Sequence, residues 1–326
     1  MEIITPENAE PHYRQFSFTG KGLDLFKIYI VNWILSVITL GLYYPWAKAA
    51  QLKYKYQNTI FDGSSFVFHG TGAEIFRGFI KIVGLFVAFM VVYALAIMSQ
   101  NTLFIALAVI VFYAILIIIS PIAIHSSAKY RTSRSSWRGI HFGYRGILSE
   151  FVKLFTVNII LTIFTLGIYS SWLIENTRRY IIQHLRFGNI TFDYMGNGDT
   201  LFMRRLTGRI LTFITLGIYY FWFQMDMIKY FVDNIRVEQN GKVLYVSFSA
   251  KGSDFFKLSI VNLLILIFTF GLGYAWAEIR TLQFIAENLW LEGNFDANNL
   301  NQTEQEFKDA SGDDMLDMLD LDLGIV

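Results

Sequence analysis

The stretch Thr39-Leu40-Gly41-Leu42-Tyr43-Tyr44-Pro45-Trp46 closes the first long apolar segment of the chain. Nearly the same eight residues close three later apolar segments, reading TLGIYSSW at 165–172, TLGIYYFW at 215–222 and TFGLGYAW at 269–276. The likeness extends outward, because an asparagine or a histidine follows each of these tryptophans by twelve residues. Agreement at several fixed offsets indicates that one structural unit is duplicated along the chain.

Composition places these units in a membrane. The chain of 326 residues is 54% hydrophobic and 16% charged, whereas soluble domains carry roughly 25% charged residues. Most of its uncharged segments reach the ~20 residues that a helix needs to cross a bilayer. These six segments cover residues 28–47, 82–98, 103–124, 154–174, 210–225 and 258–277. A soluble fold buries one such helix in its core but not six, so the sequence predicts a membrane protein.

Several functional classes are disfavoured by what the sequence lacks. Residues 1–15 are polar and lack the basic start and cleavage site of a signal peptide, so we expect the first apolar segment to remain as an anchor. Cysteine is absent, and the five histidines lack metal-ligand spacing. No nucleophile elbow or phosphate-binding loop is present. We therefore predict no enzymatic activity, cofactor, metal or nucleic-acid partner.

Short segments of alternating polarity separate the apolar ones and predict strands at 16–18, 66–68, 140–142, 190–192 and 243–249. They divide residues 16–296 into five related units, 16–65, 66–139, 140–189, 190–243 and 244–296. The second unit lacks the Thr-Leu-Gly motif and joins two plain helices through a neutral turn at 99–102, which is typical of a transmembrane hairpin. The predicted fold class is mainly α, a multi-pass membrane protein of helix–Thr-Leu-Gly turn–helix repeats joined by short β-strands.

Two topologies are open for the units that carry the motif. A single crossing fits the length from Lys27 to Trp46, roughly 28 Å, but it divides the basic residues almost evenly between the two sides. A re-entrant unit that turns at Gly41 leaves only residues 99–102 outside and every basic stretch in the cytoplasm. Its difficulty is the return arm, where Lys48 and Lys53 are costly at depth unless they face water or a partner. We favour the re-entrant topology.

The motifs together resemble a known family. They comprise Phe-x-Phe-x-Gly-Lys-Gly from Phe16 to Gly22, Lys-x-Tyr-x-Val-Asn from Lys27 to Asn32, and the segments 39–46, 58–66 and 137–140. This pattern is similar to that of the YjgN-like bacterial inner-membrane proteins, a domain of unknown function, over residues 16 to about 296. The resemblance implies a multi-pass protein of the bacterial inner membrane and assigns no activity or ligand.

Repeated polar residues inside the apolar segments are the first candidates for function. Amides seven residues before the threonine suggest a polar cavity, or else hydrogen bonds between helices worth about 1 kcal/mol each. The threonine and glycine of each motif suggest broken helices of the kind that frame transporter sites, or else close helix packing. These candidates are Asn32, Asn158 and Asn262; Thr39, Thr165, Thr215 and Thr269; and Gly41, Gly167, Gly217 and Gly271.

Charged residues near the segment ends form a second set. Three acids, Glu175, Asp226 and Glu278, suggest a proton relay, or else ion pairs with Arg178, Lys229 and Arg280 on an interfacial helix. The cluster Lys129, Arg131, Arg134 and Arg138 suggests binding of lipid headgroups, or else cations that only fix the topology.

The acidic segment 297–326 is expected to be a disordered tail, in which 313–323 spaces leucines like a short amphipathic docking peptide. Two functions follow as hypotheses. The first is a channel or transporter for a small polar or anionic solute, based on the broken segments and the amides. The alternative is a non-catalytic membrane scaffold that recruits a protein partner through the acidic tail.

Overall fold

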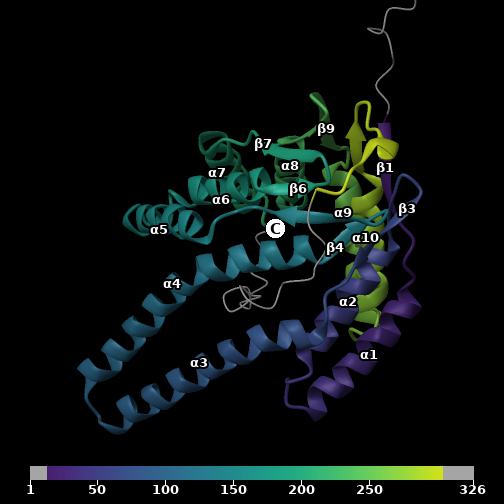
Figure 1. Cartoon of the computed structure of the whole chain (residues 1–326). Helices are drawn as coiled ribbons and strands as arrows, with labels where there is room; N and C mark the ends of the chain where they lie inside the picture. The colour runs from purple at the N-terminus through teal and green to yellow at the C-terminus, as the bar shows by residue number, and fades with distance from the viewer. Residues whose placement is uncertain (1–12, 304–326) are drawn as a thin grey trace, which may run out of the picture.

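The computed structural model describes residues 13–303, in which one arrangement recurs five times: a strand, two helices and a second strand (Figure 1). The strands are β1 (Tyr13–Phe18), β2 (Thr59–Phe61), β3 (Ser64–Phe68), β4 (Ser135–Trp137), β5 (Ile140–Tyr144), β6 (Leu185–Phe187), β7 (Ile190–Tyr194), β8 (Ile235–Gln239), β9 (Lys242–Phe248) and β10 (Leu289–Glu292). The helices are α1 (Gly22–Ile38), α2 (Tyr44–Asn58), α3 (Gly72–Met98), α4 (Thr102–Ser133), α5 (Leu148–Phe164), α6 (Ser170–Gln183), α7 (Gly198–Ile214), α8 (Tyr220–Asp233), α9 (Gly252–Phe268) and α10 (Tyr274–Glu287).

The strands close into a ten-stranded barrel in the order β1-β10-β9-β8-β7-β6-β5-β4-β3-β2, with every neighbouring pair antiparallel. Because neighbours are antiparallel, all five helical hairpins leave from one end of the barrel, here called the hairpin end. The tight turns, such as Asp62-Gly63 and Asn240-Gly241, lie at the opposite turn end. The sequence predicted the first strand of each unit, at β1, β3, β5, β7 and β9. The second strand of each unit and the closure into a barrel, which leaves no exposed sheet edge, are new findings.

The barrel interior is a belt of apolar side chains, to which each strand–hairpin–strand unit contributes one cross-strand pair. The pairs are Phe16 with Phe61, Phe66 with Trp137, Phe142 with Phe187, Phe192 with Val237, and Val246 with Leu291. These residues and their neighbours form the main hydrophobic core. A cavity of about 270 Å³ remains inside the belt, and the side chains that line it are all apolar. Such a cavity offers no hydrogen-bond partner to water, so it is expected to be dry.

The segment after β10 closes the turn end of the barrel. Phe295 is buried there, with its ring 5.5 Å from that of Phe61. The Gln239 amide donates to the Asp296 carbonyl at 2.8 Å and accepts from the Asp296 N–H at 2.9 Å. The Thr303 hydroxyl donates to the Gly188 carbonyl at 2.6 Å. Residues 297–303, which the sequence assigned to a disordered tail, therefore pack on the barrel. The proposed docking peptide 313–323 lies outside the described residues.

The helices correct the prediction of six long apolar segments. Among the described residues, α3 and α4 are long and apolar enough to cross a membrane, and they extend well beyond the other hairpins (Figure 1). The other four apolar segments break at the Thr-Leu-Gly motif into helices of 14 to 17 residues. An uncharged segment of the right length is therefore not a single helix when a helix-ending signal lies inside it.

That signal is the same in all four copies. Leu40 and Gly41 have φ values of 52° and 89°, and the Gly41 N–H donates to the Ser36 carbonyl at 2.7 Å, as in a Schellman helix end. The Thr39 hydroxyl donates to the Leu35 carbonyl at 2.7 Å and accepts from the Tyr43 N–H at 3.0 Å. The same threonine bridge occurs at Thr165, Thr215 and Thr269. The predicted helix-break glycines Gly41, Gly167, Gly217 and Gly271 all have φ between 86° and 91°.

The closing segment gives a first prediction. Phe295→Ala removes a buried aromatic ring from the barrel and should lower the free energy of unfolding by about 3–5 kcal/mol. Thermal unfolding in a neutral detergent measures this change. Asn298→Ala, an exposed position on the same segment, is the control and should leave the melting temperature unchanged. Equal effects of the two substitutions would contradict the closing role of Phe295.

Candidate functional site

Neighbouring units interlock through the repeat tryptophan. The second helix of each unit contacts the first strand and the first helix of the next unit, and α10 contacts α1, so the helices form a closed ring. A Cβ placed on Gly22 would lie 2.4 Å from Cδ1 of Trp276, so only glycine lets the ring lie this close. The same contact joins Trp46 to Gly72, Trp172 to Gly198 and Trp222 to Gly252. The motif tryptophan therefore makes the contact at four of the five junctions between units, all except the one between α4 and α5.

A buried position three residues after each repeat tryptophan differs among the units. It holds Ala49, Glu175, Met225 and Ile279, and in α4 His125 takes this place, where Pro121 aligns with Pro45. The His125 ring lies edge-on to Tyr144 at 5.1 Å. The Glu175 carboxylate lies against Gly196 and beside Tyr194.

Burial raises the pKa of Glu175, while the phenols of Tyr194 and Tyr230 and the guanidinium of Arg178 oppose that shift. The sequence suggested a loop histidine at His125, but this residue lies buried within α4. Its offset within the repeat could have revealed the buried position.

The repeat amides do not converge on one cavity. The Asn32 amide donates to the Ala47 carbonyl at 3.4 Å, and the Asn262 amide donates to the Ala277 carbonyl at 3.2 Å, fifteen residues later in both units. Oδ1 of the Asn158 side chain accepts from the side-chain amide of Asn176 at 2.7 Å. Each asparagine therefore joins the two helices of its own hairpin, because the turn places those helices side by side.

Two of the three predicted acids, Asp226 and Glu278, form ion pairs with neighbouring helices. Asp226 pairs with Arg204 of α7 at 2.5 Å rather than with Lys229, which pairs with Asp233. Glu278 pairs with Lys55 of α2 at 2.6 Å and accepts from the Tyr29 hydroxyl.

The expected partner of Glu278, Arg280, instead donates to the Asn262 side chain at 3.2 Å. The sequence could not supply these partners, because they come from other helices of the ring.

The predicted basic cluster is spread over two parts of the fold. Lys129 and Arg131 lie on α4, and Arg134 pairs with Glu74 of α3 at 2.8 Å. Arg138 lies beyond β4 at the turn end, where it pairs with Asp62 at 3.0 Å. These four residues therefore do not form a single patch.

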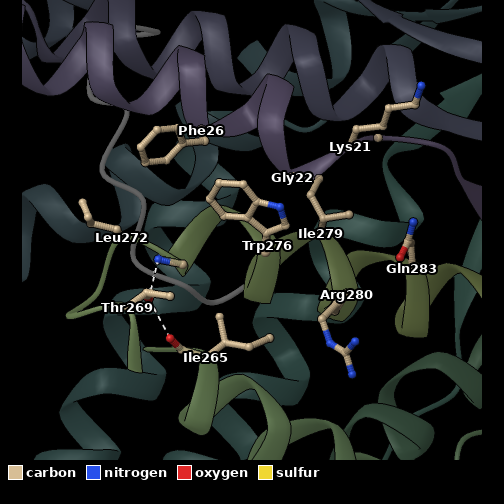
Figure 2. A pocket seen from close by; sticks show the side chains of 12 residues that line it. Lys21, Gly22, Phe26, Ile265, Thr269, Leu272, Trp276, Ile279, Arg280 and Gln283 are labelled. Carbon is tan, nitrogen blue, oxygen red and sulfur yellow. Dashed lines mark hydrogen bonds between the residues drawn. The ribbon is translucent and has the colours of Figure 1, made fainter. Parts of the chain in front are cut away.

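A cavity of about 1000 Å³ lies between α1 and the α9–α10 hairpin (Figure 2). We call it the seam groove, because it lies where the last unit meets the first. Its lining changes character along α10: Leu272 and Trp276 come first from the hairpin tip, and Arg280 and Gln283 follow. The Phe26 ring packs 5.3 Å from Trp276, and Lys21 precedes α1 at the barrel side. The groove is thus apolar toward the tip and cationic toward the barrel.

Apolar residues are exposed at the hairpin tips. The residue before each motif glycine is almost fully exposed: Leu40, Leu166, Leu216 and Phe270 range from 93% to 95%. Each also has a positive φ, a conformation that costs a non-glycine residue roughly 1–2 kcal/mol. Ile38 and Leu42, which flank Leu40, are also exposed, so this tip presents an apolar surface of the kind that marks contact with a membrane or a partner.

Comparison with known proteins agrees with the sequence motifs. The family described as "Bacterial protein of unknown function (DUF898)" matches residues 13–155, 144–211 and 242–318. The chain belongs to this family. Among curated relatives it is 30% identical to the inner membrane protein YjgN of Salmonella typhimurium over 138 residues, which is 42% of this chain and 33% of that protein. It is 36% identical to YjgN of Escherichia coli K12 over 75 residues, 23% of this chain and 18% of that protein.

The matched part thus spans a third or less of these curated relatives. No solved structure matches. Their printed names support the predicted location in a bacterial inner membrane, and the predicted YjgN-like family is confirmed.

The contact between units gives a second prediction. Gly22→Ala forces a Cβ into the Trp276 ring and should destabilise the ring of helices by more than 1 kcal/mol, measured by thermal unfolding in detergent. Gly84→Ala is the matched control in α3, because a Cβ there meets no atom within 4 Å and alanine favours a helix. A Gly22→Ala protein as stable as the control would contradict this contact.

Proposed function

We propose that the protein is a multi-pass inner-membrane protein that binds a phospholipid in the seam groove. In this proposal α3 and α4 cross the bilayer, and the other four hairpins enter one leaflet and turn back. The return helices support this depth, because their first charged residues follow the motif glycines by only seven to nine positions. That spacing gives roughly 10–14 Å of helix, less than half of a ~30 Å hydrocarbon core.

The observation that carries the proposal is the order of residues along the seam groove. A phospholipid in the leaflet entered by the hairpins has its acyl chains toward the tips and its phosphate toward the barrel. Leu272 and Trp276 would contact the chains, and Lys21 and Arg280 would lie near the phosphate. Basic side chains at a membrane surface attract anionic lipids at about 1 kcal/mol each. The cavity volume is at the upper end of the range of about 300–1,000 Å³ for small-molecule sites.

The other hypotheses receive less support. A channel for a polar or anionic solute along the barrel axis would have to pass an apolar belt and the Phe295 segment. The amides that suggested such a pathway bond within their own hairpins. A scaffold that recruits a partner through residues 313–323 depends on a segment outside the described residues. Lipid binding, in contrast, is supported by the residues that line the seam groove.

Native mass spectrometry of the full chain in a neutral detergent tests the proposal with dioleoyl-phosphatidylglycerol as the probe. The double variant Lys21→Gln/Arg280→Gln removes two charged contacts of about 1 kcal/mol each. It should raise the apparent Kd roughly thirtyfold, since a tenfold change in Kd corresponds to about 1.4 kcal/mol. The control, Arg186→Gln/Lys242→Gln, removes the same charge from barrel strands and should bind as the unmodified protein does. Equal losses in both variants, or no loss in the first, would contradict the proposal.

A further inference from the structure

Another cavity, of about 540 Å³, lies between α6 and α7, where serines of α6 face arginines of α7. We call it the α6–α7 notch. Its walls are the tip residues 166–168, the α6 residues Ser170 and Ser171, and the α7 residues Phe202, Arg205, Leu206 and Arg209. It joins the third and fourth units, whereas the seam groove joins the fifth and the first.

Two arginines one helical turn apart face this notch. Nη1 of Arg205 donates to the hydroxyls of Ser170 and Ser171, both at 3.2 Å. Within residues 13–303 neither Arg205 nor Arg209 forms an ion pair, whereas the adjacent Arg204 pairs with Asp226. Two like charges held close together without a carboxylate repel each other, and a bound anion would remove that cost.

In both walls of the notch, the residues differ from those at the equivalent positions of the other units that carry the motif. At the positions of Arg205 and Arg209, the other first helices hold Tyr29 and Trp33, Phe79 and Val83, Phe155 and Ile159, and Ser259 and Leu263. At the position of Ser170, the other motif copies hold Tyr44, Tyr220 and Tyr274. Compared with the other units that carry the motif, the α7 wall has two cations in place of uncharged residues, and the α6 wall has a serine in place of a tyrosine. That combination produces a space lined by guanidinium and hydroxyl groups.

We infer that the α6–α7 notch binds a phosphate group. A guanidinium presents planar paired donors that match phosphate oxygens, and Arg209 supplies a second one on the same face of α7. Ser171 is 1% exposed, so its hydroxyl is held in place beside Arg205. The tip residues Leu166 and Ile168 line the same notch, so the acyl chains of a membrane lipid whose phosphate binds the arginines would lie against them. That a lipid supplies the phosphate depends on the membrane insertion proposed above, but it does not depend on lipid binding in the seam groove.

The test measures binding of dioleoyl-phosphatidylglycerol, and separately of inorganic phosphate, to the full chain in neutral detergent. Arg205→Gln/Arg209→Gln should raise the apparent Kd at least tenfold. Arg205→Lys, which keeps the charge and loses the paired donors, should cause a smaller loss. Ser170→Tyr introduces the residue of three sister units and should block the notch with every charge retained. The control, Arg186→Gln/Arg236→Gln, removes two charges from the barrel strands β6 and β8.

Each result decides the inference. Loss of lipid binding in the arginine pair and in Ser170→Tyr, with the control unaffected, supports a headgroup phosphate. The same pattern with inorganic phosphate alone supports a phosphate site that is filled from solution. Unchanged binding of both probes in Ser170→Tyr and in the arginine pair, with melting temperatures near that of the unmodified protein, would overturn the inference. Repeating the lipid titration with Lys21→Gln/Arg280→Gln also present separates failure here from failure at the seam groove.

Discussion

The left-handed turn at each Thr-Leu-Gly motif is the constraint on which the rest of the structure depends. It ends one helix and starts a second that runs back beside it, so both ends of a hairpin lie at the same end of the barrel. Only then can the strands before and after the hairpin pair as antiparallel neighbours, as Phe16 pairs with Phe61. The turn also holds Leu40 and its equivalents in a costly conformation and exposes them. Strain of this kind persists where the surrounding structure fixes it and often marks a functional site.

Ring closure is the second requirement, and it follows from contacts between units rather than within them. Each repeat tryptophan packs on the glycine that begins the next unit's first helix, and Trp276 on Gly22 completes the circle. The barrel closes through the antiparallel pairing of β1 with β10, and Phe295 fills its turn end. Apart from the longer α3–α4 hairpin, units built on one plan also differ where they meet. The polar pair His125 with Tyr144 and the arginine notch at α6–α7 both lie at such junctions.

Much of the local structure could be predicted from the sequence, because the signals lie within a few residues of one another. A glycine after Thr-Leu predicts the turn at Gly41, and alternating phenylalanines predict β1 at Phe16. The barrel could not be predicted, because Tyr13 pairs with Glu292 across almost the whole chain and no local pattern encodes that register. The seam groove could not be predicted for the same reason, because its lining residues come from the first and the fifth units.

The unusual residues of the α6–α7 notch could have been found from the sequence. Comparing the four motif copies shows Ser170 where three tyrosines stand, and aligning the first helices shows Arg205 and Arg209 as cations found in one unit alone. The repeat amides were more misleading. A recurring polar residue in an apolar helix suggests a shared cavity, but Asn32 and its equivalents join the two helices of one hairpin. Repetition therefore identified the structural residues, and departures from repetition identified the candidate sites.

The central claim is that the hairpin tips turn back inside the lipid, and a cysteine-free chain allows a direct measurement. Single cysteines at Ser65, Met195, Gln100 and Leu216 can be challenged with a membrane-impermeant maleimide on intact cells and on inside-out vesicles. We expect Ser65→Cys and Met195→Cys to react from the same face, Gln100→Cys from the opposite face, and Leu216→Cys from neither. Reaction of Ser65→Cys and Met195→Cys from opposite faces, or of Leu216→Cys from the face of Gln100, would contradict the account.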